Sequence, residues 1–173
     1  IKIGMLGTGE IVRAVLDELP DRRQIPIVVD PVLCSTSGAA LLDPEGLQLL
    51  RDQLLPRCSL MTPNLIEASA LLGEHVARTS SEQAGQARAL LRFGSDGVLL
   101  KGGHGTDGES VDVLVFRVGP PSLLRAPRLG VTMRGTGCAL SSAIAALMAS
   151  GEPMASACQR AKSYVHDKLL TSR

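Results

Sequence analysis

The chain has 173 residues, 45% of them hydrophobic and 20% charged, which is the composition of a globular protein long enough to bury a core. The net charge is +1, only 2% of the residues are aromatic and basic runs are short, so the sequence argues against a nucleic-acid partner. The four cysteines lie far apart without a CxxC spacing, which argues against zinc and favours free thiols in the cytoplasm. The apolar run at 138–150 is too short to cross a membrane.

Short apolar segments alternate with helical periods along the chain. In chain order we expect a strand at 1–6, a helix at 10–20, a strand at 25–30, a helix at 43–56, a strand at 58–63, helices at 64–73 and 80–94, strands at 96–103 and 110–119, and closing helices at 137–151 and 153–170. Asp43 is the expected cap of its helix, with Pro44 in the first turn, and Ser80 or Ser81 the expected cap of another. The strand at 110–119 alternates more than the others, which favours an antiparallel arrangement there.

Strands that alternate with helices predict an α/β fold, with a mostly parallel central sheet covered by helices on both faces. We see no internal repeat, low-complexity segment or long linker, so residues 1–173 are expected to form a single domain. Ligands bind such sheets beyond the carboxyl ends of the strands. Polar residues that directly follow a predicted strand are therefore the candidates for a functional site.

Three predicted strands are followed by such residues. Asp30 ends one strand, Thr62 and Asn64 follow the next with Glu67 one helical turn later, and Lys101 ends a third. A carboxylate, an ammonium group and an Asn–Glu pair on one rim would suit a phosphate and a divalent cation. Each residue also has an ordinary interpretation: Asp30 could begin an Asp-Pro turn, Lys101 could be a solvated strand end and Glu67 could lie on a helix surface.

A fourth candidate is the glycine loop "RGTGC" at 134–138, which opens the first closing helix. Successive backbone N–H groups at Gly135, Thr136, Gly137 and Cys138 would form a concave donor array, to which the helix dipole adds positive charge. Such an array would hold a phosphoryl group during its transfer. The same field favours a thiolate at Cys138, which could act as a base toward a substrate hydroxyl. The alternative is a small residue buried at a helix start.

Four segments together resemble a known enzyme family: "DPV" at 30–32, "TPNLIEASALLG" at 62–73, "LLKGGHG" at 99–105 and "GTGCALSSAIAALMASG" at 135–151. In this order and spacing they are similar to the hydroxymethylpyrimidine and phosphomethylpyrimidine kinases of thiamine biosynthesis, which belong to the ribokinase-like superfamily. The resemblance covers nearly the whole chain. It implies a ribokinase-like fold and ATP-dependent phosphorylation of hydroxymethylpyrimidine, of its monophosphate, or of both.

The resemblance also implies roles for individual residues. Cys138, Lys101 and Asp30 would be catalytic, with Cys138 in the place where sugar kinases of the superfamily carry an aspartate base. The anion hole would be formed by Gly135, Thr136, Gly137 and Cys138. The residues implied to bind ATP and Mg²⁺ are Thr62, Asn64, Glu67, Lys101 and Gly103. Asp30 and Glu67 would contact the metal, Glu67 through water, and Val32 would contact the pyrimidine.

The chain departs from the family pattern in two respects. The family usually has about seventy further residues before the first strand, a length typical of one α/β unit. The chain therefore resembles the C-terminal, ATP-binding and catalytic portion of the kinase, as an N-terminally truncated form. Arg134 stands where the family commonly has a histidine, and an arginine there could add a phosphate contact or disturb the loop.

Two other functions stay open at this point. One is a non-catalytic remnant of the fold that binds nucleotide or a partner protein, and the other is a related kinase for pyridoxal or hydroxyethylthiazole. The expected partners are the pyrimidine substrate and ATP, with neither nucleic acid nor a membrane, and a homodimer is left open.

Overall fold

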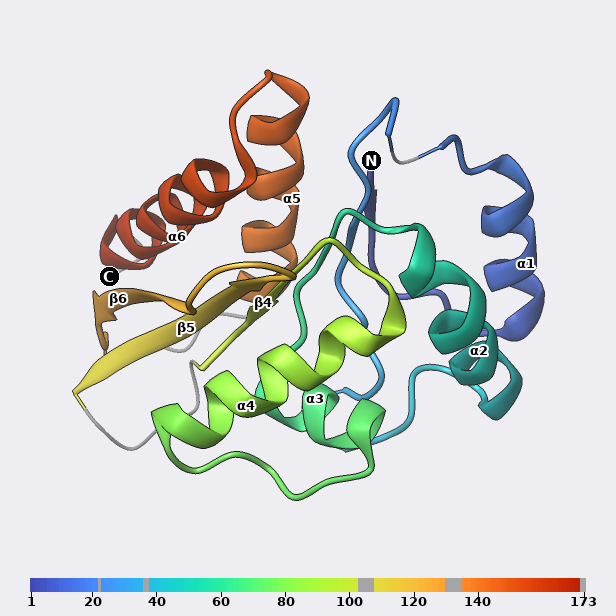
Figure 1. Cartoon of the computed structure of the whole chain (residues 1–173), viewed down its shortest axis with the longest axis horizontal. Helices are drawn as coiled ribbons and strands as arrows, with labels where there is room; N and C mark the ends of the chain where they lie inside the picture. The colour runs from blue at the N-terminus through green and yellow to red at the C-terminus, as the bar shows by residue number, and fades with distance from the viewer. Residues whose placement is uncertain (22, 36–37, 103–107, 130–134, 172–173) are drawn as a thin grey trace.

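The computed structural model of the chain describes residues 1–21, 23–35, 38–102, 108–129 and 135–171 (Figure 1). A six-stranded sheet runs through the molecule in the order β1-β2-β3-β4-β5-β6. Its strands are β1 (Lys2–Ile3), β2 (Val28–Val29), β3 (Leu60–Met61), β4 (Gly97–Leu100), β5 (Glu109–Phe116) and β6 (Ser122–Pro127). The first four strands are parallel, while β5 and β6 pair antiparallel. The mostly parallel sheet and its antiparallel β5 are therefore confirmed.

The described ranges contain six α-helices, which pack on the sheet: α1 (Gly9–Glu18), α2 (Pro44–Leu49), α3 (Leu65–Leu72), α4 (Ser80–Leu90), α5 (Thr136–Ala149) and α6 (Met154–Thr171). A π-helical segment (Leu50–Leu54) and a 3₁₀ turn (Leu55–Arg57) extend α2, and a second 3₁₀ turn (Leu91–Phe93) follows α4. The Asp43 side chain caps α2 by accepting the Gly46 N–H, and Pro44 lies in the first turn, as the sequence predicts. None of the helices in the described ranges is both long and apolar enough to span a membrane.

The helices cover both faces of the sheet, because adjacent strand residues point to opposite sides. Val29, Met61 and Val98 face a core that α1–α4 complete, whereas Val28, Leu60 and Leu99 face α5 and α6. Figure 1 shows this division, with α5 and α6 on one side of the strands and α1–α4 on the other. The packing fixes α5 against the parallel strands, so that its N-terminus begins beside their carboxyl ends.

Two details differ from the sequence-based expectations. The cap of α4 is Thr79, one residue earlier than expected, because its hydroxyl and the Glu82 carboxylate form a reciprocal capping box. The strand β6 was not predicted, because only Leu124 is buried along it and Arg125 and Pro127 interrupt its apolar pattern. A proline is tolerated there because β6 lies at the edge of the sheet.

Candidate active site

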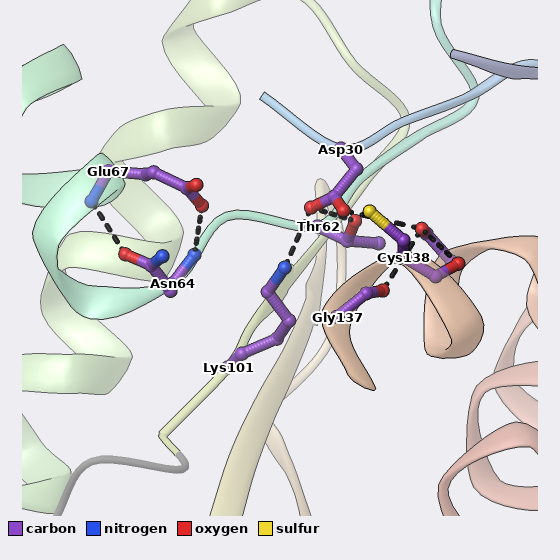
Figure 2. A network of polar contacts seen from close by, with 8 residues as sticks. Asp30, Thr62, Asn64, Glu67, Lys101, Gly137 and Cys138 are labelled. Atoms are coloured by element: carbon purple, nitrogen blue, oxygen red, sulfur yellow. Dashed lines mark hydrogen bonds and ion pairs between the residues drawn. The ribbon is translucent and has the colours of Figure 1, made fainter. Parts of the chain in front are cut away.

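The predicted rim residues come together at the carboxyl ends of three neighbouring strands (Figure 2). Asp30 follows β2, Thr62 follows β3 and Lys101 follows β4, and these strands are adjacent in the sheet. Backbone pairing continues past the ends of β3 and β4, where the Lys101 N–H donates to the Pro63 carbonyl at 2.8 Å. The convergence follows from parallel pairing, which brings the carboxyl ends of the strands to one edge.

A buried ion pair forms the centre of the site. The Lys101 Nζ lies 2.7 Å from Asp30 Oδ1, and the two side chains are only 14% and 2% exposed. The Thr62 hydroxyl lies 3.3 Å from the same carboxylate oxygen and the Ser141 hydroxyl lies 3.4 Å from Oδ2. A carboxylate this deeply buried needs such partners, because desolvation of an unpaired charge is costly. The pair therefore holds one positive and one negative group at the rim, on opposite sides of β3.

The N-terminus of α5 lies next to this ion pair. Gly135 is the N-cap with φ of +81°, in the left-handed region that favours glycine, and no side chain in the described part of the chain caps the helix. The first N–H that bonds within the helix is that of Ala139, which donates to the Gly135 carbonyl. No acceptor for the N–H groups of the preceding turn lies among the residues that the structure describes, which is the pattern of an anion site at a helix N-terminus.

Gly137 lies directly against the ion pair. A Cβ atom built there would stand 3.1 Å from Lys101 Nζ and 3.9 Å from Asp30 Oδ2. Because glycine lacks this atom, the helix start and the lysine ammonium approach each other closely. The full positive charge of Lys101 and the partial positive charge of the α5 N-terminus therefore lie next to each other, and both favour an anion there.

Asn64 and Glu67 form the N-terminal capping box of α3. The Glu67 N–H donates to Asn64 Oδ1 at 2.8 Å, and the Asn64 N–H donates to Glu67 Oε2 at 2.7 Å. The Asn-x-x-Glu spacing thus has a local structural cause, since each side chain satisfies a backbone donor of the other residue. The box also fixes the Glu67 carboxylate in one orientation toward the site (Figure 2).

The Glu67 carboxyl is electrostatically coupled to the ion pair. Burial raises its pKa from 4.5 to about 6, because desolvation disfavours the carboxylate. The Lys101 charge and the Asn64 N–H lower the pKa, whereas the Asp30 charge raises it further. The Glu67 carboxyl thus interacts electrostatically with both charges of the Lys101–Asp30 pair.

The donor set fits a hydrated Mg²⁺ ion. Within the described ranges no three His, Cys, Asp or Glu side chains cluster as a direct metal cage. Asp30 and Glu67 are both buried carboxylates, and each has an oxygen engaged by a protein donor. Mg²⁺ usually keeps several waters and takes few protein carboxylates when it is bound together with phosphates. These two residues could therefore hold a metal largely through water, and their metal roles stay predictions.

The remaining predicted residues lie at different distances from this centre. Thr136 and Cys138 are in the first turn of α5, where the Cys138 thiol is exposed and its carbonyl lies 3.1 Å from the Ser141 hydroxyl. Val32 is half-buried, and its N–H donates to the Asp30 carbonyl within the turn after β2. Gly103 and Arg134 lie outside the described residues. The catalytic and binding roles of all these residues stay predictions.

Ser141 is a site residue that the sequence reasoning missed. It lies one turn after Gly137 on α5, fully buried, and its hydroxyl contacts both Asp30 and the Gly137 carbonyl. The only signal in the sequence is a hydroxyl four residues after Gly137, on the same face of a mostly apolar helix. Ser141 therefore links the start of α5 to the Asp30 carboxylate.

Comparison with known proteins gives a consistent result. A family model described as phosphomethylpyrimidine kinase matches residues 1–172. The chain is 47% identical over 147 residues to the hydroxymethylpyrimidine/phosphomethylpyrimidine kinase of Salmonella typhimurium, covering 84% of the chain and 55% of that protein. It is 44% identical over 169 residues to the enzyme of the same name from Escherichia coli, covering 97% of the chain and 63% of that protein. The chain thus spans about three fifths of the length of these relatives.

Solved structures give the same fold. A phosphomethylpyrimidine kinase from Clostridium difficile is 33% identical with a TM-score of 0.80, covering 96% of the chain and 67% of that structure. An ADP complex of Bacillus subtilis pyridoxal kinase is 30% identical with a TM-score of 0.83, covering 94% of the chain and 60% of that structure. The predicted ribokinase-like α/β fold is therefore confirmed.

The raised pKa of Glu67 predicts a pH-dependent stability. Between pH 4.5 and about 6 the folded chain binds more protons than the unfolded chain, so stability falls as pH rises through this window. At neutral pH the buried carboxylate costs about 2 kcal/mol. Glu67→Gln keeps an acceptor for the Asn64 N–H without the charge, and should raise the free energy of unfolding at neutral pH by about 1–2 kcal/mol.

Urea unfolding of both proteins at neutral pH and below pH 4.5 measures this difference. The higher free energy of unfolding of Glu67→Gln should disappear at the lower pH, where the glutamate is protonated in both the folded and the unfolded chain. Glu18→Gln, at an exposed position on α1, controls for the loss of one negative charge. An equal gain in the free energy of unfolding at both pH values would show that burial of the Glu67 charge is not the cause of the gain.

Proposed function

The chain belongs to the phosphomethylpyrimidine kinase family, and we propose that it transfers a phosphoryl group from ATP to hydroxymethylpyrimidine, to its monophosphate, or to both, in thiamine biosynthesis. The observation that carries this proposal is the buried Lys101–Asp30 pair against the start of α5, which none of the described side chains caps. Phosphoryl transfer depends mostly on positioning and on stabilisation of charge, which are the two things this arrangement offers.

In this proposal the start of α5 and Lys101 hold the phosphoryl group during transfer. The N–H groups of Thr136, Gly137 and Cys138 donate to its oxygens, and the adjacent Lys101 ammonium adds a full positive charge. Asp30 holds Lys101 in place through the 2.7 Å contact between Oδ1 and Nζ. Because these groups are fixed before the substrate arrives, little reorganisation accompanies the reaction.

Mg²⁺ would neutralise developing charge on the phosphates, and Asp30 and Glu67 would hold it largely through water. The capping box orients Glu67 toward the rim, while Thr62 and Asn64 shape the ATP side of the site. The contacts of Gly103 with ATP and of Val32 with the pyrimidine stay predictions. A cytoplasmic location, a homodimer and the absence of a nucleic-acid partner also stay predictions.

Cys138 is the group we propose to accept the proton from the substrate hydroxyl. It lies in the first turn of α5, and its thiol is exposed rather than packed into the core. A thiol at this position could reach a substrate hydroxyl beside the phosphoryl group that the helix start would hold. Exposure argues against the alternative of a small residue buried at a helix start.

Pyridoxal phosphorylation is a second candidate activity, because similar solved structures include pyridoxal kinases. The pyridoxal kinase of Staphylococcus aureus, crystallised with AMP-PCP and pyridoxal, is 26% identical with a TM-score of 0.82. The higher identity to the pyrimidine kinases favours the pyrimidine. A third candidate, a non-catalytic remnant of the fold, would have no need of the Lys101–Asp30 pair at the rim.

A coupled ADP-release assay on the full chain tests the function. We expect ATP-dependent turnover with hydroxymethylpyrimidine or its phosphate, and slower turnover or none with pyridoxal. Faster turnover with pyridoxal would favour the second activity. ATP binding without turnover of any of the three compounds would favour the remnant.

Lys101→Ala should lower kcat by about 100-fold or more, because it removes the charge that faces the transferred group. It also leaves the Asp30 carboxylate buried without its cation, so thermal unfolding is measured alongside turnover. Lys168→Ala, in the last turn of α6, is the matched control and should leave kcat unchanged. Wild-type turnover in a folded Lys101→Ala protein would remove Lys101 from the mechanism.

Cys138→Ala should lower kcat by about 100-fold while the affinity for ATP changes little, because the thiol is assigned to the proton and not to the phosphates. Cys34→Ala removes the other exposed thiol in the described part of the chain and serves as the control. Steady-state kinetics and calorimetric titration with ATP measure the two effects separately. If turnover is unaltered, the base is not Cys138.

A further inference from the structure

A second buried ion pair lies outside the candidate active site. Lys162 Nζ, from α6, lies 2.7 Å from Asp112 Oδ2, from β5, and both side chains are only 7% exposed. Ser110 Oγ lies 3.4 Å from the same ammonium group. Replacing a buried pair by apolar residues is often neutral or stabilising, so stability alone is weak grounds for keeping two charges here.

The second carboxylate oxygen of Asp112 binds the backbone next to the active-site lysine. Asp112 Oδ1 accepts the N–H of Gly102 at 2.9 Å in a buried position. Gly102 directly follows Lys101, whose side chain makes the ion pair of the active site. One carboxylate therefore connects α6 to the backbone that carries the active-site lysine.

Gly102 is held tightly on its other sides as well. A Cβ atom built there would stand 1.9 Å from the Val111 carbonyl oxygen and 2.6 Å from Gln83 Nε2. Gln83 Nε2 in turn donates to the carbonyls of Leu100 and Val111, at 3.2 and 3.1 Å. The chain thus has no room to shift toward β5 at this point, and the charged hydrogen bond from Asp112 fixes the direction of its amide.

The peptide groups on either side of the Lys101 Cα are therefore both anchored. The Lys101 N–H donates to the Pro63 carbonyl, and the Gly102 N–H donates to Asp112. With both ends fixed, the side chain starts from a defined place, and its ammonium group reaches Asp30 and the start of α5. A small rotation of this backbone would be magnified along the four-carbon side chain.

We propose that Asp112 and Lys162 are positioning residues for Lys101: Lys162 holds the Asp112 carboxylate, which holds the Gly102 amide and so aims the lysine at the transferred phosphoryl group. This inference rests on the proposed function, since the phosphoryl group is what the lysine is aimed at. It extends the functional machinery to α6, whose residues do not touch the rim.

Two double variants of the full chain test the proposal without leaving a charge unpaired. Asp112→Asn/Lys162→Met keeps an amide oxygen for the Gly102 N–H, whereas Asp112→Val/Lys162→Met removes that acceptor. Both lack the ion pair, so both should fold, and thermal unfolding verifies this. We expect kcat to be about tenfold lower in the Val variant than in the Asn variant, with the KM for the pyrimidine unchanged.

The same two variants in a Lys101→Ala background distinguish positioning from a general structural role. If the pair acts through Lys101, the tenfold difference in kcat disappears once the lysine is absent. A difference that persists there, or equal kcat values with the lysine present, would overturn the proposal. Ser110→Ala, which removes only the hydroxyl beside Lys162, is the matched control and should have wild-type kcat.

Hydrogen exchange of the Gly102 amide, followed by NMR, separates this inference from the proposed function. The amide should exchange faster in the Val variant than in the Asn variant, whether or not the chain turns over a substrate. If the wild type is inactive, the proposed function fails and AMP-PCP affinity replaces kcat in the comparison. Equal exchange rates in the two variants would overturn the role of Asp112 at Gly102.

Discussion

The ion pair between Asp30 and Lys101 is the interaction on which the site depends. It joins the ends of β2 and β4 across β3, and its carboxylate is only 2% exposed. A charge in this position is tolerated because Lys101, Thr62 and Ser141 surround it with donors. The arrangement places a positive group next to the N–H groups of α5 without exposing it fully to water, where its field would be screened.

The sheet explains why these groups meet. Strands with two buried faces pack α1–α4 on one side and α5 and α6 on the other. The start of α5 thereby lies beside Asp30, which follows β2, and Lys101, which follows β4. The left-handed Gly135 turns the chain into the helix, and Gly137 lets the helix start approach the lysine. The buried Asp112–Lys162 pair then connects α6, through Gly102, to the backbone next to that lysine.

The parts of this account that local sequence encodes could be predicted. Asp30 and Lys101 each follow an apolar β-type run, and parallel strands must end at one edge, so their proximity followed from pattern alone. The Asn64–Glu67 spacing was also visible, but a capping box and a metal role would both use this spacing; the structure shows the capping box, and the metal role stays a proposal. The predicted fold, its mostly parallel sheet and its family resemblance agree with the structure and the comparisons.

Contacts between residues far apart in the sequence could not be predicted. Ser141 lies 111 positions from Asp30, and Lys162 lies 50 positions from Asp112, and neither spacing has a local signature. A serine in a mostly apolar helix and a lysine in an amphipathic one look ordinary until the packing shows what they face. The edge strand β6 was missed for a related reason, since its pairing with β5 rather than its own composition makes it a strand.

A crystal structure of the full chain with AMP-PCP and Mg²⁺ tests the central claim most directly. The account predicts that the terminal phosphate lies within hydrogen-bonding distance of the backbone N–H groups at 136–138 and of the Lys101 ammonium group. A nucleotide whose phosphates lie away from the start of α5, with the Lys101–Asp30 pair facing only protein, would contradict it.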